Sequence, residues 1–250
     1  MKNCALGMIV FVFAGFAVSC ATPARSAVLA DGRPVALVSV VSNWDINWHG
    51  EAEVNPALIG AASRRALRDD PDLAIISNAD VLINSAERIL RGAAFASGGL
   101  ITFADREELL ESNAYRQANL NRRRINSAHS IPDGFRLIDP RDRNFPQALA
   151  EEKGIYRSMF VDFTFTKAMR SGFGRNGSGG VNVAMRVQIV DDGGATLYNR
   201  TFNVISRDTL RVANGRYSSS ELMALFDASI LDAGHDFIEH FSDMISRLRF

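Results

Sequence analysis

Both tryptophans of the chain lie in one short polar stretch whose residue types suit binding or catalysis. Trp44 and Trp48 stand four residues apart, interspersed with Asp45, His49 and Glu51. The stretch follows a valine-rich run that predicts a buried strand, and open α/β sheets bind ligands where such strands end. Tryptophan suits a binding site because it buries a large area and keeps an N–H to donate. The alternative is that both indoles cover the edge of the core.

Histidine and acidic side chains recur near the C-terminus, at a spacing where two of them would share a metal ion. His235 and Glu239 stand one helical turn apart, and His240 follows. The spacing matches neither H-E-x-x-H nor H-x-x-E-H. His235 and Glu239, with Ser242 and Ser246, fall opposite an apolar stripe that contains Phe237, which is typical of the solvated face of an amphipathic helix. We therefore predict no metal site and no cofactor here.

A glycine-rich segment has the letters of a dinucleotide-binding motif, G-x-G-x-x-G, at Gly172, Gly174 and Gly177. Such a site needs its glycines between a strand and a helix, so that the helix N-terminus faces the pyrophosphate. Here the following residues alternate in the manner of a strand. The segment therefore predicts a flexible hairpin loop, extended by residues 178–180, that serves at most as a contact surface.

Arg122, Arg123 and Arg124, with Arg116 nearby, form the only basic cluster in the sequence. Such a cluster suits anionic lipid headgroups, although most clusters of this kind are simply solvated loops. The formal net charge of the chain is zero, which argues against nucleic acid as a partner. The sequence has no G-x-S-x-G elbow, so we expect no enzymatic activity of the serine hydrolase type.

The N-terminus has the three parts of an export signal. Lys2 supplies a positive start, and residues 5–18 form an apolar run shorter than the roughly 20 residues of a membrane span. Small residues then lead to Cys20. The chain contains one other cysteine, Cys4, inside the signal, so a mature protein that begins at Cys20 cannot form an internal disulfide.

The residues Ala17, Val18, Ser19 and Cys20 resemble the lipobox of bacterial lipoproteins. The resemblance implies cleavage before Cys20 and lipidation of that cysteine with several acyl chains such as palmitate, enough for stable attachment. We therefore predict a signal peptide over residues 1–19, a lipidated tether over residues 20–33 and one domain over residues 34–250. Ala21 replaces the aspartate that retains such proteins at the inner membrane of enteric bacteria, which favours the outer membrane.

The mature part predicts an α/β (α+β) domain with a mixed sheet, helices packed on it and a long C-terminal helix. The expected strands before the meander cover residues 35–41, 100–103 and 134–138, and the expected helices cover residues 55–69, 78–91, 105–118 and 146–153. An antiparallel meander follows over residues 160–168, 181–189 and 197–205, with a turn at Asp191. Ser218 and Glu221 form a capping box for the last helix.

The order of these elements is similar to lipoproteins of spirochaete type and, more distantly, to the CsgG and TolB N-terminal fold group of envelope proteins. The similarity rests on the lipobox, the first strand, the late meander and the final amphipathic helix. It implies a role in binding or assembly in the periplasm or at the cell surface, and it provides no catalytic residues to transfer.

We therefore expect a membrane-anchored, non-enzymatic protein of the cell envelope that binds another envelope protein through the segment from Trp44 to Glu51. A lipoprotein that binds a small ligand beneath the two tryptophans is the alternative. A hydrolase of unknown type would require Asp45, His49 or Glu51 to meet a distant serine or acid.

Overall fold

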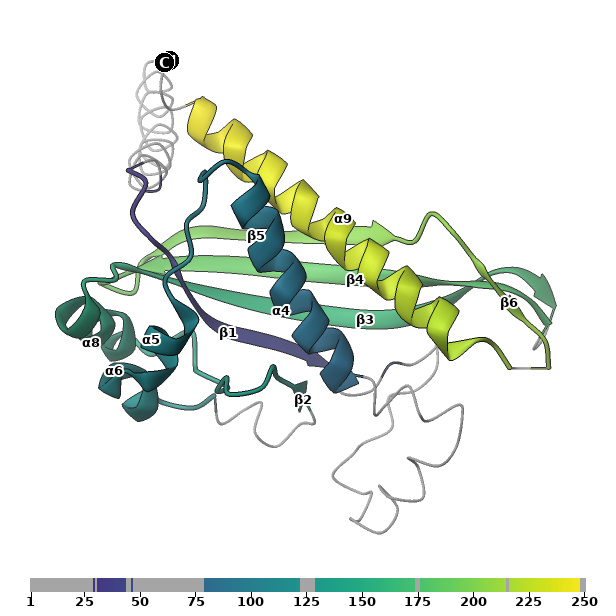
Figure 1. Ribbon diagram of the computed structural model, residues 1–250, viewed down its shortest axis with the longest axis horizontal. Helices are drawn as coiled ribbons and strands as arrows, with labels where there is room; N and C mark the ends of the chain where they lie inside the picture. The colour runs from purple at the N-terminus through teal and green to yellow at the C-terminus, as the bar shows by residue number, and fades with distance from the viewer. Residues whose placement is uncertain are drawn as a thin grey trace, which may run out of the picture.

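The computed structural model describes residues 29, 31–43, 46, 79–121, 129–173, 176–214 and 216–247. It shows a mixed sheet with helices packed on it, as the sequence predicted, and the helices lie on both faces of the sheet (Figure 1). Two long helices lie side by side across one face: α4 (Ala79–Ala96) and α9 (Ser219–Ser246). Three short helices gather over one end of the other face: α5 (Arg106–Glu111), α6 (Asn113–Gln117) and α8 (Asn144–Lys153).

The strands follow the order β2-β1-β3-β4-β5, and β6 pairs with β4 beyond the end of β5. The first strands are β1 (Ala36–Asn43), β2 (His129–Ser130) and β3 (Arg157–Phe173). The others are β4 (Asn176–Asp191), β5 (Thr196–Ile205) and β6 (Leu210–Val212). Strands β1 and β3 are parallel and every other pair is antiparallel. The predicted meander is therefore confirmed as β3-β4-β5.

Strict alternation along β3 and β4 divides the sheet into an apolar and a polar face. The buried residues of the two strands face α4 and α9, and they include Phe163, Phe165, Val181, Val183, Met185, Val187 and Ile189. Asp162 and Thr164 project from the opposite face and are only partly buried or exposed. One sheet face thus holds the main core, while much of the other stays polar.

The glycine-rich segment is a strand hairpin and not the extended loop that the sequence predicted. Gly172 pairs with Gly177, and residues 178–180 continue β4 between β3 and β6. Gly172 has a φ of +116°, and a Cβ there would lie 2.1 Å from the carbonyl oxygen of Asn176. Glycine is required because the two strands approach so closely. The glycines therefore serve strand pairing, since the next element is a strand and not a nucleotide-binding helix.

Helix α9 begins where its predicted cap stands, because the Ser218 hydroxyl accepts the N–H of Glu221. The helix packs against α4 at small residues: an added Cβ on Gly234 would lie 3.6 Å from the Cβ of Ala93. The Ser85 hydroxyl of α4 also donates a 2.8 Å hydrogen bond to the Asp227 carboxylate of α9. Helix α4 runs past its predicted end to Ala96, and of the added residues Ala93 and Ala94 are buried.

Three local predictions were wrong. The expected helix over residues 105–118 is divided at Ser112, whose hydroxyl caps the N–H of Tyr115, while the Glu152 carboxylate accepts the N–H groups of Asn113 and Ala114. Residues 134–138 form no strand, and residues 100–103 contribute only the single bridge between Phe103 and Val35. The expected helix over residues 55–69 lies outside the described residues.

Candidate functional site

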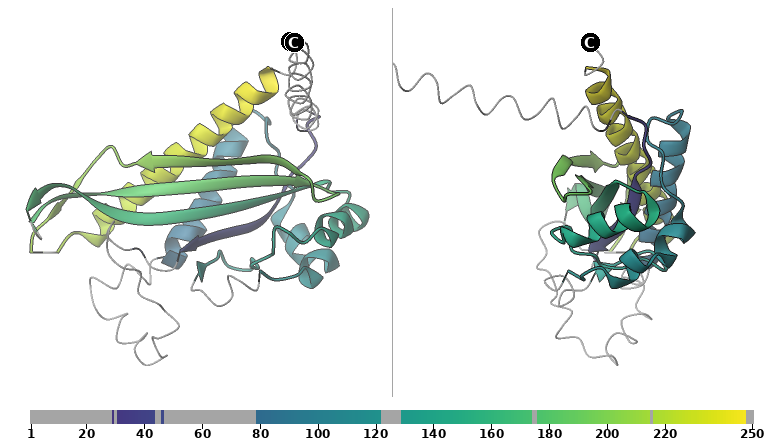
Figure 2. Two further views of the ribbon diagram at one scale, coloured as in Figure 1. Left: turned by 180° about the vertical axis from the view of Figure 1, so that it is seen from behind. Right: turned by 90° about the vertical axis from the view of Figure 1, so that its left-hand side faces the viewer.

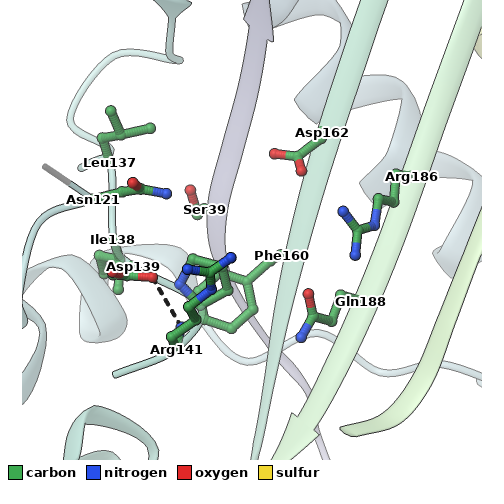
Figure 3. Close-up of a pocket in the computed structure, with 11 residues that line it drawn as sticks. Ser39, Asn121, Leu137, Ile138, Asp139, Arg141, Phe160, Asp162, Arg186 and Gln188 are labelled. Carbon is green, nitrogen blue, oxygen red and sulfur yellow. Dashed lines mark hydrogen bonds between the residues drawn. The ribbon is translucent and has the colours of Figure 1, made fainter. Parts of the chain in front are cut away.

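A pocket of about 340 Å³ opens on the polar face of the sheet, beside the three short helices. Its floor comes from β1, β3 and β4, and its wall from the connection between α6 and α8 (Figure 3). The lining residues are Ser39, Asn121, Leu137, Ile138, Asp139, Pro140, Arg141, Phe160, Asp162, Arg186 and Gln188. The volume lies within the range of small-molecule sites.

The pairing register of the strands brings the polar floor together. Asp162 of β3 stands directly opposite Arg186 of β4, and Phe160 stands opposite Gln188. Alternation places all four side chains on one face, so a carboxylate, a guanidinium, an amide and an aromatic ring lie side by side (Figure 3). The Nε of Arg186 donates a 3.0 Å hydrogen bond to the side chain of Asn199 on β5, which orients the guanidinium.

Backbone hydrogen bonds hold the wall in place. The N–H of Asn121 donates to the carbonyl of Leu137 at 2.8 Å, and the N–H of Asp139 donates to the carbonyl of Asn119 at 2.9 Å. The Asp139 carboxylate accepts the N–H of Arg141 at 3.0 Å. Hydrogen bonds within the chain therefore fix the wall, which lowers the ordering cost of binding.

Tyr115 of α6 ties the same connection to the short helices. Its hydroxyl accepts the backbone N–H of Arg136 at 2.8 Å, and the Arg136 guanidinium donates to the carbonyl of Tyr115. Burial raises the pKa of Tyr115 to about 12, although the Arg136 N–H and guanidinium favour its ionised form. Tyr115 is therefore a neutral structural support at physiological pH.

The lining offers groups of both charges and little acid–base chemistry. Asp139 and Asp162 supply carboxylates, while Arg141 and Arg186 supply guanidinium groups. No histidine, cysteine or lysine is among the lining residues within the described part of the chain, so this lining provides no side chain whose ordinary pKa lies near 7. Such a set is suited to recognising a small polar molecule by charge-assisted hydrogen bonds.

Two comparisons with known proteins gave no match that would assign a role to this pocket. No family model matches the chain, and no curated protein matches it.

The residues that the sequence singled out for binding lie elsewhere in the chain. Cys20, Trp44, Asp45, Trp48, His49 and Glu51 are outside the described residues, as are Arg122, Arg123 and Arg124. Ile46, in the middle of the tryptophan segment, is described and is buried in the main core. Both indoles lie outside the described residues, so the binding interpretation and the core-cover interpretation of this segment both stay predictions.

The two histidines of α9 differ in burial: His235 lies on the solvated face, as predicted, and His240 is partly buried. His235 and Glu239 are exposed, and the described residues contain no group of three or more His, Cys, Asp or Glu side chains that would hold a metal ion. His240 turns towards β5: its Nδ1 lies 3.0 Å from the Tyr198 hydroxyl, and its Nε2 contacts the Arg200 guanidinium. Since Arg200 only donates, Nε2 accepts and the ring is neutral.

The stability of the fold is expected to fall as the pH drops below about 6.5, the ordinary pKa of histidine, in part because of His240. Partial burial and the Arg200 charge lower the pKa of His240. His240 in the unfolded chain then binds a proton at higher pH than in the folded chain. Its contribution to the free energy of unfolding is therefore fully present above pH 6.5 and declines below that pH. Chemical denaturation between pH 7.5 and 5 measures this decline, and H240N should make it shallower than in wild type. An equally steep decline in H240N would contradict the assignment.

The sequence pattern indicates only the part of the pocket that lies on the strands. Asp162, Arg186 and Gln188 are polar members of the alternating pattern in the predicted meander, and such a pattern signals a solvated face as readily as a site. The wall residues Asp139 and Arg141 gave no signal, since they lie in irregular chain. Their approach to β3 and β4 depends on long-range packing.

Proposed function

We propose that the chain is a lipid-anchored, non-enzymatic protein of the bacterial cell envelope, favouring the outer membrane, that binds a small polar molecule in the pocket on the polar sheet face. The observation that supports this most is the set of two carboxylates, two guanidinium groups and two amides around one preformed cavity. The balance of charge favours a zwitterionic ligand over a simple anion or cation. Within the described part of the chain, no helix is both long enough and apolar enough to cross a bilayer.

Arg186→Gln is expected to weaken ligand binding about tenfold or more, because a charge-assisted hydrogen bond contributes about 1.5–3 kcal/mol. The full chain would be titrated with three probes by calorimetry: glycylglycine as a zwitterion, inorganic phosphate as an anion and putrescine as a cation. We expect the dipeptide to bind most tightly and R186Q to reduce its affinity.

R211Q is the matched control for this experiment, since Arg211 is an exposed arginine of β6 that does not line the pocket. It should bind the dipeptide as wild type does. Binding of phosphate or putrescine in preference to the dipeptide would contradict a zwitterionic ligand. Failure of all three probes, or equal binding by wild type and R186Q, would reject the pocket as the site.

Cys20→Ser is expected to abolish stable membrane attachment in a bacterial host. The wild-type protein should gain the mass of its acyl chains and partition into detergent, because two or more chains anchor a protein stably. The variant should remain an unprocessed precursor or be released in water-soluble form. If both proteins were processed and water-soluble, the chain would be an ordinary exported protein and the anchor proposal would fail.

A protein partner is the second candidate, and the position of β5 favours it. In the strand order this strand pairs with β4 and stands at the edge of the sheet, with ten residues available for an added strand. A photo-crosslinking residue at the exposed Asn203 should then capture one envelope protein in living cells. The same residue at the exposed turn position Asp192 should not, and equal capture at both sites would argue against β5.

A further inference from the structure

Residues 92–100, at the end of helix α4, form an uncharged tip. The chain carries no charged residue between Arg91 and Asp105, and within this stretch residues 92, 95, 96, 98 and 99 are exposed. Phe95 is the extreme case, because 89% of its surface is accessible. Single exposed apolar side chains are common on protein surfaces, but water contact with a whole phenylalanine ring is unfavourable, and here the residues around the ring are uncharged as well.

The tip lies at the end of the domain where the chain enters the fold. The N–H of Val35 donates to the carbonyl of Thr102 at 2.8 Å, and the N–H of Ala104 donates to the carbonyl of Val35 at 2.9 Å. These bonds fix the chain after the tip beside the start of β1. Figures 1 and 2 show that α4 ends on the side of the domain where β1 begins.

The predicted tether is too short to let this end move far from a membrane. Leu29 is already buried in the main core, and the chain from Cys20 to Leu29 reaches at most ~30 Å when fully extended. Strand β3 starts beside Ala36 and has 17 residues, so its far end lies ~55 Å away. A lipid on Cys20 therefore holds the end with the tip, and not the distant hairpin, towards the bilayer.

The chemistry of the tip suits the interfacial layer of a bilayer. Its two exposed glycines, Gly98 and Gly99, have positive φ and open space around them, and the Phe95 ring is almost fully accessible. Arg91 is the charged residue that directly precedes the tip in the sequence. Its guanidinium contacts the Glu87 carboxylate and lies over the Phe103 ring. Insertion of the tip would therefore desolvate no unpaired charge of its own.

We propose that residues 92–100 form a membrane-docking tip that inserts the Phe95 ring into the interfacial region of the bilayer to which the protein is anchored. The inference rests on the proposed lipid anchor. Aromatic side chains are favoured at this depth. The tip fixes the orientation of the domain on the membrane, with the long hairpin of β3 and β4 pointing away.

Ala96→Cys provides a reporter beside Phe95, because Cys4 leaves with the signal and the Cys20 thiol is occupied by lipid. The purified lipidated protein would carry an environment-sensitive fluorophore on this cysteine and would be reconstituted into vesicles of phosphatidylethanolamine and phosphatidylglycerol. We expect a blue-shifted emission and strong quenching by doxyl-labelled lipid. Val81→Cys is the matched control, since Val81 is exposed at the opposite end of α4 and its label should report water.

Phe95→Asp in the Ala96→Cys background should remove the blue shift while leaving the circular dichroism unchanged, because the ring makes little contact with the fold. A water-like label at position 96 in vesicles that carry the protein would overturn the docking tip and leave the anchor intact. A blue shift that survives Phe95→Asp, or that appears equally at position 81, would overturn it as well. If the lipidated protein did not float with the vesicles, the anchor would fail and this inference with it.

Discussion

Replacing Phe237 by alanine is expected to lower the free energy of unfolding by about 3–5 kcal/mol. The ring has no accessible surface and lies between α9 and β5, with its centroid 5.8 Å from Tyr198, 6.0 Å from Phe202 and 5.8 Å from Phe241. Edge-to-face contacts add to the area that the ring buries. Removal of the ring leaves a cavity that a long helix over a sheet cannot close.

Urea denaturation followed by circular dichroism measures this effect, and the slope of the transition should stay constant while the midpoint falls. Phe95→Ala is a control with the same change of side chain at an exposed position, and it should alter stability by less than about 0.5 kcal/mol. Similar losses in the two variants would show that Phe237 does not occupy the core as described.

Asp31→Ala is expected to cost about 2 kcal/mol, since it removes the carboxylate that faces a buried guanidinium. The Arg157 side chain is 3% exposed, and its Nη2 lies 2.5 Å from the Asp31 carboxylate, while its Nη1 donates to the carbonyl of Arg33 at 3.2 Å. The pair fastens the segment before β1 to the start of β3. The cost lies below that of a fully buried ion pair because Asp31 is partly exposed.

This contribution also depends on pH. Burial raises the pKa of Asp31, but the hydrogen bond from the N–H of Arg33 and the Arg157 charge outweigh it, so the pKa lies below its ordinary value of 3.8. Stability from the pair is therefore present above pH 3.8 and is lost as the pH falls through the lower pKa of the folded state. Denaturation at pH 7 and at pH 3 measures the stability that Asp31→Ala loses and the dependence of that loss on pH. Asp208→Ala, at an exposed loop position, should change neither, and a neutral Asp31→Ala would contradict the clamp.

Local pattern was sufficient for the elements whose surroundings are uniform along their length. Alternation located β3, β4 and β5 because one face of each meets the same helical layer, and the stripe through Phe237 located α9 for the same reason. The cap at Ser218 and the left-handed glycine at Gly154, which ends α8, depend on adjacent residues alone. For these features, sequence neighbours are also the spatial neighbours.

Local pattern failed where a distant residue decides the outcome. The carboxylate of Glu152, from α8, holds the N-terminus of α6 and so favours two short helices over one. The side-chain amide of Asn43 donates to the carbonyl of Phe165 and accepts the backbone N–H of Phe165. No local sequence pattern predicts this pairing. Gly179 is a strand residue because β3 and β6 pair with it from both sides, and Gly180 pairs with β3.

The pocket shows the same division between local and distant causes. Alternation alone placed Asp162 and Arg186 on a polar face, but a polar face is common to most solvated sheets. It becomes the floor of a pocket only because Asn121 and residues 137–141 lie over β1, β3 and β4, with Asp139 and Arg141 among the lining residues. Tertiary packing decided this arrangement, since the energy that holds the wall comes from hydrogen bonds and apolar contacts between segments remote in sequence.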